Sequence, residues 1–415
     1  MKTEINKIVV MGLGYIGLPT ASMLATKGYA VVGVDVTPDT VETINQGKIH
    51  IVEPDLDLLV KSAVHSGNLT ASLEPCEADV FIIAVPTPFY KNKDDAVKVP
   101  DISFIEAATR SIAPFLNKDN LVILESTSPV GTTERVHSVI AELRPELVQS
   151  NPNNHEPPIF IAHCPERVLP GQILRELVDN DRIIGGLDKA SAQKAHGLYK
   201  TFSNGQILLT DCRTAELAKL VENSFRDVNI AFANELSLIC DMVGVNVWEL
   251  ISLANRHPRV NILQPGPGVG GHCIAVDPWF IVDAAPDLSR LIRTAREVND
   301  FKPQWVVEKV KSRAVRFKDP VIGCLGLTFK ANIDDVRESP ALEITREICK
   351  NNLGRVIVCE PNIARNFSEF PVHSLNDVIK LADILVLLVD HDEFREVDSE
   401  LLKEKVVIDT RGIWK

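Results

Sequence analysis

The chain has 415 residues, of which 45% are apolar and 24% charged, and its formal net charge is -12. This is the composition of an ordinary globular protein, and at roughly 150 residues per domain the length predicts two or three domains. The acidic balance disfavours a nucleic-acid partner, because such partners select a basic surface.

The eight cysteines are scattered along the chain, and none belongs to a CxxC pair. Such scatter does not indicate a disulfide framework and predicts reduced thiols in the cytoplasm. The N-terminus runs into an apolar strand without the pattern of a signal peptide, and no apolar run approaches the ~18 residues of a membrane span. We therefore expect a cytoplasmic protein without a membrane partner or a metal site.

The first part of the chain alternates strand and helix patterns. Residues 7–12 and 29–36 are predicted strands, separated by a glycine turn and a helical pattern that ends at Gly28. Apolar runs at 78–88, 120–129 and 158–166 follow, which predicts a parallel sheet with crossover helices. The polar, proline-rich stretch 141–158 is predicted to be a surface loop of this domain.

A long helical pattern begins near Thr214, a predicted N-cap, and runs to Gly244. Its length exceeds that of most globular helices, so we expect it between domains or at a subunit interface. Near residue 318 a second alternation of strands and helices begins, which predicts a smaller parallel α/β domain.

The segment GLGYIG (residues 12–17) has the GxGxxG spacing of a dinucleotide-binding turn. Gly12 allows the tight turn, Gly14 the approach of a pyrophosphate, and Gly17 the packing of helix on strand. Asp35 ends the second strand, where it would bind a ribose diol and repel a 2′-phosphate. A structural glycine turn is the alternative, but the surrounding strand, helix and acid favour NAD.

Two threonines follow later strands, at the edge where open α/β sheets bind ligands. Thr87 lies in AVPTP and Thr127 in ESTSPVG. Ordinary turn chemistry is the alternative for either one.

Cys273 lies in QPGPGVGGHCIAVDPW (residues 264–279), a loop rich in glycine and proline with Asp277 four residues later. A thiol beside a nicotinamide cofactor indicates a covalent adduct with a carbonyl, for which the thiolate is the reactive form. A buried small apolar residue is the alternative for a lone cysteine.

Lys219, Asn223 and Arg226 are spaced i, i+4 and i+7 along the long helix, so they share one face. They could hold an oxyanion or sugar hydroxyls, or simply form a solvated face. Further charged residues beside glycines, prolines and strand ends indicate a phosphate site: Glu166, Arg167, Arg256, His257, Arg259, Lys330 and Arg337.

The segments GLGYIG, EST-P-G, CPER, KLVEN, GGHC with a following aspartate, and FK with a later DDVRESP span essentially the whole chain. Together they resemble the UDP-glucose/GDP-mannose dehydrogenase family. The stretch NRHPRVNILQPGPGVGGHCIAVDPWFI is more similar to the branch that acts on UDP-N-acetyl-D-mannosamine than to the UDP-glucose branch.

The resemblance implies an α/β fold in three parts: a Rossmann NAD-binding domain (1–212), a central helical dimerisation segment (213–315) and a Rossmann-like UDP-binding domain (316–415). It implies a homodimer, with one arginine of the site supplied by the other subunit. It also implies oxidation of the C6 alcohol of a UDP-sugar to a carboxylate with two NAD reduced, for use in a bacterial surface glycan such as enterobacterial common antigen or a capsule.

The resemblance also implies residue roles. Cys273 would be the nucleophile, with Lys219 and Asn223 stabilising oxyanions, Asp277 orienting Lys219 or water, and Glu166 with Thr127 serving thioester hydrolysis. The implied cofactor residues are Gly12, Gly14, Tyr15, Ile16, Gly17, Asp35, Thr87, Thr127 and Arg337. The implied substrate residues are Arg167, Val168, Lys219, Asn223, Arg226, His257, Arg259, Gly270 and Lys330.

Three alternatives stay open. The same reaction could act on UDP-N-acetylglucosamine or UDP-glucose. A two-electron dehydrogenase of β-hydroxyacid type would also carry a lysine and an asparagine four residues apart, but would not need Cys273. A catalytically silent NAD-binding protein would be expected to lack the thiol or the lysine, and both are present.

Overall fold

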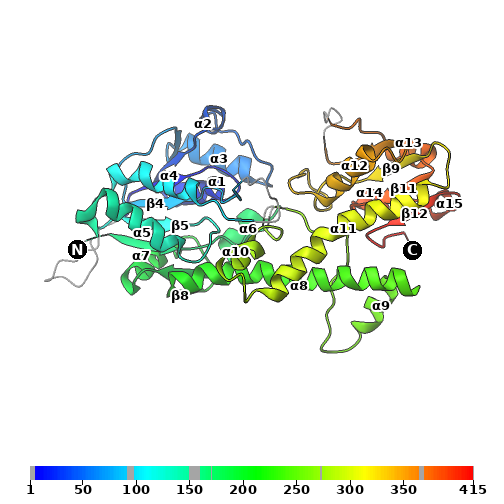
Figure 1. Cartoon of the computed structure of the whole chain (residues 1–415). Helices are drawn as coiled ribbons and strands as arrows, with labels where there is room; N and C mark the ends of the chain where they lie inside the picture. Colours follow the sequence, from blue (N-terminus) through cyan, green and yellow to red (C-terminus); the bar gives the residue numbers. More distant parts are fainter. Residues whose placement is uncertain are drawn as a thin grey trace. The chain divides into compact units, whose positions relative to one another are not determined.

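The structure is a computed structural model that describes residues 5–90, 98–148, 159–169, 171–271, 273–363 and 369–414. The chain forms two compact units. Unit 1 is Met1–Val221 with Trp279–Ala284, and unit 2 is Glu222–Pro278 with Ala285–Lys415. One helix, α8 (Cys212–Val243), carries residues of both units (Figure 1).

Unit 1 is built on an eight-stranded sheet in the order β3-β2-β1-β4-β5-β6-β7-β8. The order from β3 to β6 is that of a Rossmann fold, in which ligands bind at the carboxyl ends of the strands. The strands are β1 (Lys7–Met11), β2 (Ala30–Val34), β3 (Leu69–Ser72), β4 (Val80–Ile83), β5 (Leu121–Leu124), β6 (Phe160–His163), β7 (Arg182–Gly186) and β8 (Ile207–Asp211).

Both faces of this sheet are buried. Successive strand residues point to opposite sides, so each strand contributes to two cores. Ile8 and Val10 of β1 belong to one apolar core, while Val9 and Met11 belong to another. The first core includes residues of α1 (Gly17–Thr26), α3 (Leu56–His65) and α7 (Lys189–Tyr199), and the second includes residues of α4 (Ser103–Ile112) and α5 (Thr132–Leu143). The remaining short elements of unit 1 are α2 (Pro38–Asn45), η1 (Ala113–Phe115), η2 (Pro145–Leu147) and α6 (Ile173–Asp179).

The sequence pattern predicted a parallel sheet, but the first sheet is not wholly parallel. Strand β7 runs antiparallel to β6, with Ala162 opposite Gly186 and His163 opposite Gly185. Strand β8 then pairs parallel to β7. The first residue of β7, Arg182, therefore lies at the edge of the sheet where β6 ends.

Two local predictions need correction. The stretch 141–158 does not begin as a loop, because α5 continues to Leu143 and the turn η2 buries Leu147; residues 149–158 lie outside the described residues. The long helix α8 begins two residues before Thr214, and the cap is Asp211, whose Oδ1 accepts a hydrogen bond from the Thr214 backbone N at 2.9 Å.

Unit 2 contains a four-stranded parallel sheet in the order β10-β9-β11-β12. The strands are β9 (Val321–Leu325), β10 (Arg355–Cys359), β11 (Ile384–Leu387) and β12 (Val406–Asp409). The helices of this domain are α12 (Pro340–Lys350), α13 (Leu375–Leu381), α14 (Asp392–Arg395) and α15 (Ser399–Leu402). This is the second α/β domain that the sequence predicted.

The rest of unit 2 contains α9 (Val247–Ala254), the start of α10 (Asp277–Ala284) and α11 (Arg290–Ala314). A buried polar network joins α8 to α11. Arg296 Nη1 lies 2.6 Å from Asp227 Oδ1, and Asn299 Nδ2 donates to the same oxygen at 2.8 Å. Asn299 Oδ1 accepts from Asn234 Nδ2 at 2.8 Å, and Asn234 Oδ1 accepts from Gly266 N at 2.9 Å. The network thus fixes the start of the cysteine loop to both helices.

Across the part of the chain that the structure describes, no helix combines the length and apolar character that crossing a bilayer would require.

Candidate active site

The glycine turn after β1 has the close contacts that its spacing predicted. A Cβ on Gly17 would lie 1.9 Å from the Gly12 carbonyl oxygen, and one on Gly12 would lie 2.6 Å from the Ala84 oxygen. A Cβ on Gly14 would meet nothing within 4 Å, so the space over this residue is open for a pyrophosphate. The following helix α1 has no acid in its first turn and no side-chain cap, which leaves its positive end to an anion.

Asp35 is held at the end of β2 by two backbone amides. Its Oδ2 accepts from Leu13 N at 3.0 Å and its Oδ1 from Thr37 N at 3.0 Å. Each carboxylate oxygen has lone pairs left for a ribose diol. Tyr15 and Ile16, also predicted cofactor residues, are half-buried in the turn that leads into α1.

Thr87 and Thr127 come from neighbouring strand ends, since β4 pairs with β5. Ser126 ties these ends together by donating from its hydroxyl to the Val85 oxygen at 2.7 Å. Among the described residues, the hydroxyls of Thr87 and Ser128 are buried without a hydrogen-bond partner. Buried hydroxyls are rarely left unpaired, so these groups fit a polar ligand at this edge, as a dinucleotide requires.

Glu166 is buried at the end of β6 in an ion pair with Arg182. Arg182 Nη1 lies 3.0 Å from Glu166 Oε2, with side-chain exposures of 4% and 5%. The other oxygen, Oε1, accepts from the Arg167 backbone N at 2.8 Å. The Arg167 guanidinium donates to the carbonyl oxygen of Asp181, and Val168 is half-buried beside it. The segment that carries these predicted site residues is thus fixed to the start of β7.

A second buried acid, Glu125, lies near this pair. Tyr199 Oη donates to Glu125 Oε1 at 2.6 Å, and Thr20 Oγ1 donates to Oε2 at 3.3 Å. Burial and then the negative charge of Glu166 raise the pKa of Glu125 to about 7, against the lowering effect of the Tyr199 hydrogen bond. Glu125 was not singled out from the sequence, although its place at the end of a strand was the signal that could have found it.

The cysteine loop presses against the segment 329–340 of unit 2. A Cβ on Gly270 would lie 2.5 Å from the Glu338 oxygen and 2.8 Å from the Phe329 Cβ, so only glycine fits there. Cys273 follows, half-buried, and its carbonyl oxygen accepts from Asp277 N at 2.8 Å at the start of α10. This bond ties the backbone of Cys273 to the start of α10.

Asn223 and Asp277 are brought together, since Asn223 Nδ2 donates to Asp277 Oδ2 at 2.5 Å. Asp277 is buried, and through its backbone bond to Cys273 it connects Asn223 with the thiol segment. On α8, Lys219 is buried, Asn223 half-buried and Arg226 exposed, so the predicted polar face is graded from inside to outside.

The predicted site residues of unit 2 lie near the carboxyl end of β9. Glu360 is buried and accepts from Leu327 N at 2.7 Å, which fixes the turn that leads to Phe329 and the exposed Lys330. Burial acts to raise the pKa of Glu360, but the hydrogen bond and charge of His391 together with the backbone hydrogen bonds of Leu327 and Asn362 outweigh this and lower it. Arg337 is exposed and lies 2.6 Å from Asp335.

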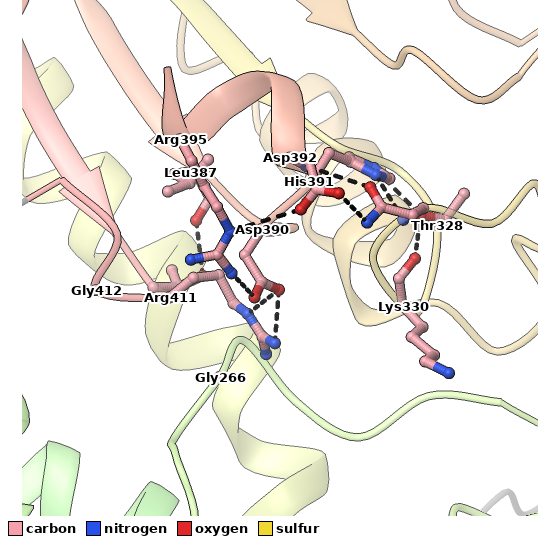
Figure 2. A network of polar contacts seen from close by, with 12 residues as sticks. Gly266, Thr328, Lys330, Leu387, Asp390, His391, Asp392, Arg395, Arg411 and Gly412 are labelled. Carbon is pink, nitrogen blue, oxygen red and sulfur yellow. Dashed lines mark hydrogen bonds and ion pairs between the residues drawn. The ribbon is translucent and has the colours of Figure 1, made fainter. Parts of the chain in front are cut away.

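Figure 2 shows a second cationic group at this edge, which the sequence reading missed. Arg411 follows β12 and binds Asp390 Oδ1 through Nε at 2.8 Å, while Arg395 binds Asp390 Oδ2 at 2.7 Å. All three line a cavity of about 640 Å³ with Trp248 and Arg256. The sequence feature that could have identified this group is the position of Arg411 directly after a predicted strand. His257 and Arg259 are exposed in the loop after α9 and are absent from the residues that line this cavity.

Comparison with known proteins agrees with this arrangement. The UDP-glucose/GDP-mannose dehydrogenase family matches by its NAD-binding domain at residues 6–203, its central domain at 213–301 and its UDP-binding domain at 323–415. An NDP-N-acetyl-D-galactosaminuronic acid dehydrogenase of Ralstonia nicotianae is 59% identical, over 99% of this chain and 97% of its own. A UDP-N-acetyl-D-mannosamine dehydrogenase of Escherichia coli is 53% identical, over 98% and 99%.

A solved structure is also similar along the whole chain. The UDP-N-acetyl-mannosamine dehydrogenase Cap5O from Staphylococcus aureus has a TM-score of 0.88 and 42% identity, covering 99% of this chain and 96% of its own. The chain belongs to the UDP-glucose/GDP-mannose dehydrogenase family. It is a nucleotide-sugar dehydrogenase whose N-terminal domain binds NAD, so the resemblance, the fold class and the cofactor predicted from the sequence are confirmed.

Replacing Glu125 by glutamine should change how stability depends on pH. A carboxyl whose pKa is raised in the folded state stabilises the fold below its unfolded pKa, and this contribution is lost as the pH rises through about 7. Between pH 4.5 and 7 we expect the unfolding free energy of Glu125→Gln to rise by about 2–3 kcal/mol relative to the unsubstituted protein. Urea denaturation at several pH values measures this difference. The exposed Glu74→Gln is the control, and a difference that stays constant with pH would contradict the assignment.

Proposed function

We propose that the chain oxidises the C6 alcohol of UDP-N-acetyl-D-mannosamine to the carboxylate of UDP-N-acetyl-D-mannosaminuronate. The observation that carries this proposal is the placement of Cys273 shortly after the closely packed Gly270, joined through Asp277 to Asn223. The names of the Escherichia coli and Staphylococcus aureus relatives support the mannosamine sugar. The product would serve a bacterial surface glycan, and the reaction would take place in the cytoplasm.

The thiol allows a four-electron oxidation at one carbon. NAD, when bound, accepts one hydride in each of two oxidation steps. The first oxidation leaves an aldehyde, to which the Cys273 thiolate adds, forming an S–C6 bond and a thiohemiacetal. The second oxidation turns this adduct into a thioester. Water then forms the new C–O bond, the C–S bond breaks, and the Cys273 thiolate leaves with the acid as product.

The other residues move protons and stabilise charge in this proposal. Lys219 assists proton transfer from the alcohol and, with Asn223, stabilises the oxyanions of the tetrahedral adducts. Asp277 orients this machinery by accepting the Asn223 amide at 2.5 Å. Glu166 takes a proton from the hydrolytic water, which Thr127 positions.

We propose that the nucleotide is held mainly by the UDP-binding domain. Lys330 and Arg411 would meet the phosphates, because a cationic edge matches their charge. Arg337 would reach NAD. The further substrate contacts are assigned to Arg167, Val168, Arg226, His257, Arg259 and Gly270, with one arginine supplied by a second subunit.

The sugar that the enzyme oxidises distinguishes this proposal from its closest alternatives. The Ralstonia nicotianae relative carries an N-acetyl-D-galactosaminuronic acid name, so UDP-N-acetylgalactosamine joins UDP-N-acetylglucosamine and UDP-glucose as an alternative. Purified protein with each of the four sugars should give two NADH per sugar oxidised, with the mannosamine sugar at least about 10-fold ahead in kcat/KM. One NADH per sugar would indicate the two-electron dehydrogenase, and no NADH with any sugar a silent NAD-binding protein.

Cys273→Ser should lower the release of the acid by at least about 100-fold while NAD binding persists, because serine forms no thioester. Cys76→Ser is the matched control, since Cys76 is also half-buried. Mass spectrometry of the sugar product and fluorescence titration of NADH measure the two properties. Full four-electron turnover by Cys273→Ser would rule out the covalent role.

We further propose that the protein is a homodimer that pairs through α8. Within unit 2 this helix exposes apolar side chains at heptad spacing: Phe225 is 70% exposed, Phe232 51% and Ile239 46%. Such a stripe on one helix face matches a second helix of the same kind.

Phe232→Glu should convert the dimer to a monomer, because a charge at the centre of this stripe opposes burial. Light scattering after size exclusion measures the mass, and the exposed Leu381→Glu in α13 is the control. A monomeric unsubstituted protein, or a dimer that survives the substitution, would contradict the proposal.

A further inference from the structure

We propose that Arg182 is a positioning residue for the hydrolytic half of the reaction, because it holds the Glu166 carboxylate in one orientation. This inference rests on the proposed role of Glu166 as the group that takes a proton from water. Arg182 itself would touch neither substrate nor cofactor.

The reversal of one strand brings Arg182 to the site. In an open α/β sheet the ligand edge lies at the carboxyl ends of parallel strands. Strand β7 runs antiparallel to β6, so its amino end, Arg182, lies at that edge beside the residues that follow β6. A parallel β7 would place Arg182 at the opposite edge, away from Glu166.

The contacts of Arg182 leave its guanidinium little freedom. Nη1 lies 3.0 Å from Glu166 Oε2, and Nη2 donates to the Leu177 carbonyl oxygen at 2.8 Å. The guanidinium also lies over two rings, 4.9 Å from the centroid of Tyr199 and 5.3 Å from that of Phe202. The planar fork is therefore fixed on several sides, which a lysine cannot reproduce.

Glu166 is in turn fixed at both oxygens. Oε2 is held by Arg182 and Oε1 by the Arg167 backbone N at 2.8 Å. A carboxylate offers about four lone-pair sites, so each oxygen can still accept a proton or hydrogen bond from water. The two fixed contacts orient the remaining lone pairs.

The neighbouring acid takes its hydrogen bonds from other side chains. Glu125 receives its hydrogen bonds from neutral donors, Tyr199 at 2.6 Å and Thr20 at 3.3 Å. Its pKa of about 7 means that Glu125 is largely protonated below neutral pH. Burial acts to lower the pKa of Arg182, but its ionisable neighbours, with Glu166 contributing most among them, together outweigh burial and raise it.

The chemical consequence is confined to hydrolysis. Glu166 accepts one proton of the attacking water as the water oxygen bonds to the thioester carbon and the bond to the Cys273 sulfur breaks. Hydride transfer, which precedes this step, needs no base at Glu166. Loss of Arg182 should therefore slow acid release and leave the two oxidations intact.

The test compares Arg182→Lys and Arg182→Gln with the unsubstituted enzyme and with Arg110→Gln, which removes an exposed arginine from a pair 3.2 Å apart. With UDP-N-acetyl-D-mannosamine and NAD, we expect a rapid burst of two NADH per site followed by a steady rate about 100-fold lower in Arg182→Gln and less reduced in Arg182→Lys. Intact-mass spectrometry should detect the acyl adduct on Cys273 in both variants. Arg110→Gln should show neither effect.

A purely structural role predicts a different result, in which burst and steady rate fall together with stability and no adduct accumulates. If Arg182→Gln fails to fold, Arg182→Lys keeps the charge and still decides the matter when combined with Glu166→Gln. The double variant should be no slower than Glu166→Gln alone, and additive losses would overturn the inference. Adduct in Glu166→Gln but not in Arg182→Lys would also overturn it, whereas no adduct in Glu166→Gln would refute the proposed function itself.

Discussion

The buried ion pair between Arg296 and Asp227 is the contact on which the geometry of unit 2 depends. Its side chains are 2% and 0% exposed, and its partners extend through Asn299 and Asn234 to the backbone of Gly266. Burial acts to raise the pKa of Asp227, and Arg296 opposes this. Removing one partner of such a pair costs about 3–5 kcal/mol, because the other charge is left buried. The loop that delivers the thiol therefore inherits its rigidity from two helices.

In unit 1, buried polar residues likewise support the carboxyl ends of the strands. Glycines at the first strand end leave room for a pyrophosphate, while buried acids stand at later strand ends. Glu216 of α8 serves the same edge by accepting from Gly131 N at 2.6 Å and Thr133 N at 2.7 Å, which caps α5. Glu166 is thus supported by Arg182 and the start of α5 by Glu216, two residues that the proposed reaction would not touch.

The sequence was most informative where a local conformation or contact allows only one residue type, or where a helical period is long. The turn from Gly12 to Gly17 followed from contacts that only glycine allows, and α8 from a sustained apolar period. The direction of β7 could not be predicted, because a short buried strand has the same pattern in either orientation. Arg182 and Arg411 were missed for a related reason. The role of each depends on an ion pair with a residue far away in sequence, Glu166 and Asp390 respectively, and the sequence pattern does not reveal such pairs.

Cys273, the thiol of the proposed reaction, is one of eight cysteines, and burial sets several of the others apart from it chemically. Burial raises the pKa of Cys164, Cys324 and Cys359 to about 12 and that of Cys212 to about 11. At neutral pH these sulfurs stay protonated, so alkylating agents and peroxides meet little thiolate there. An electrophile shaped like the sugar aldehyde could thus label the half-buried Cys273 while the deeply buried cysteines stay untouched, without any need to remove them first.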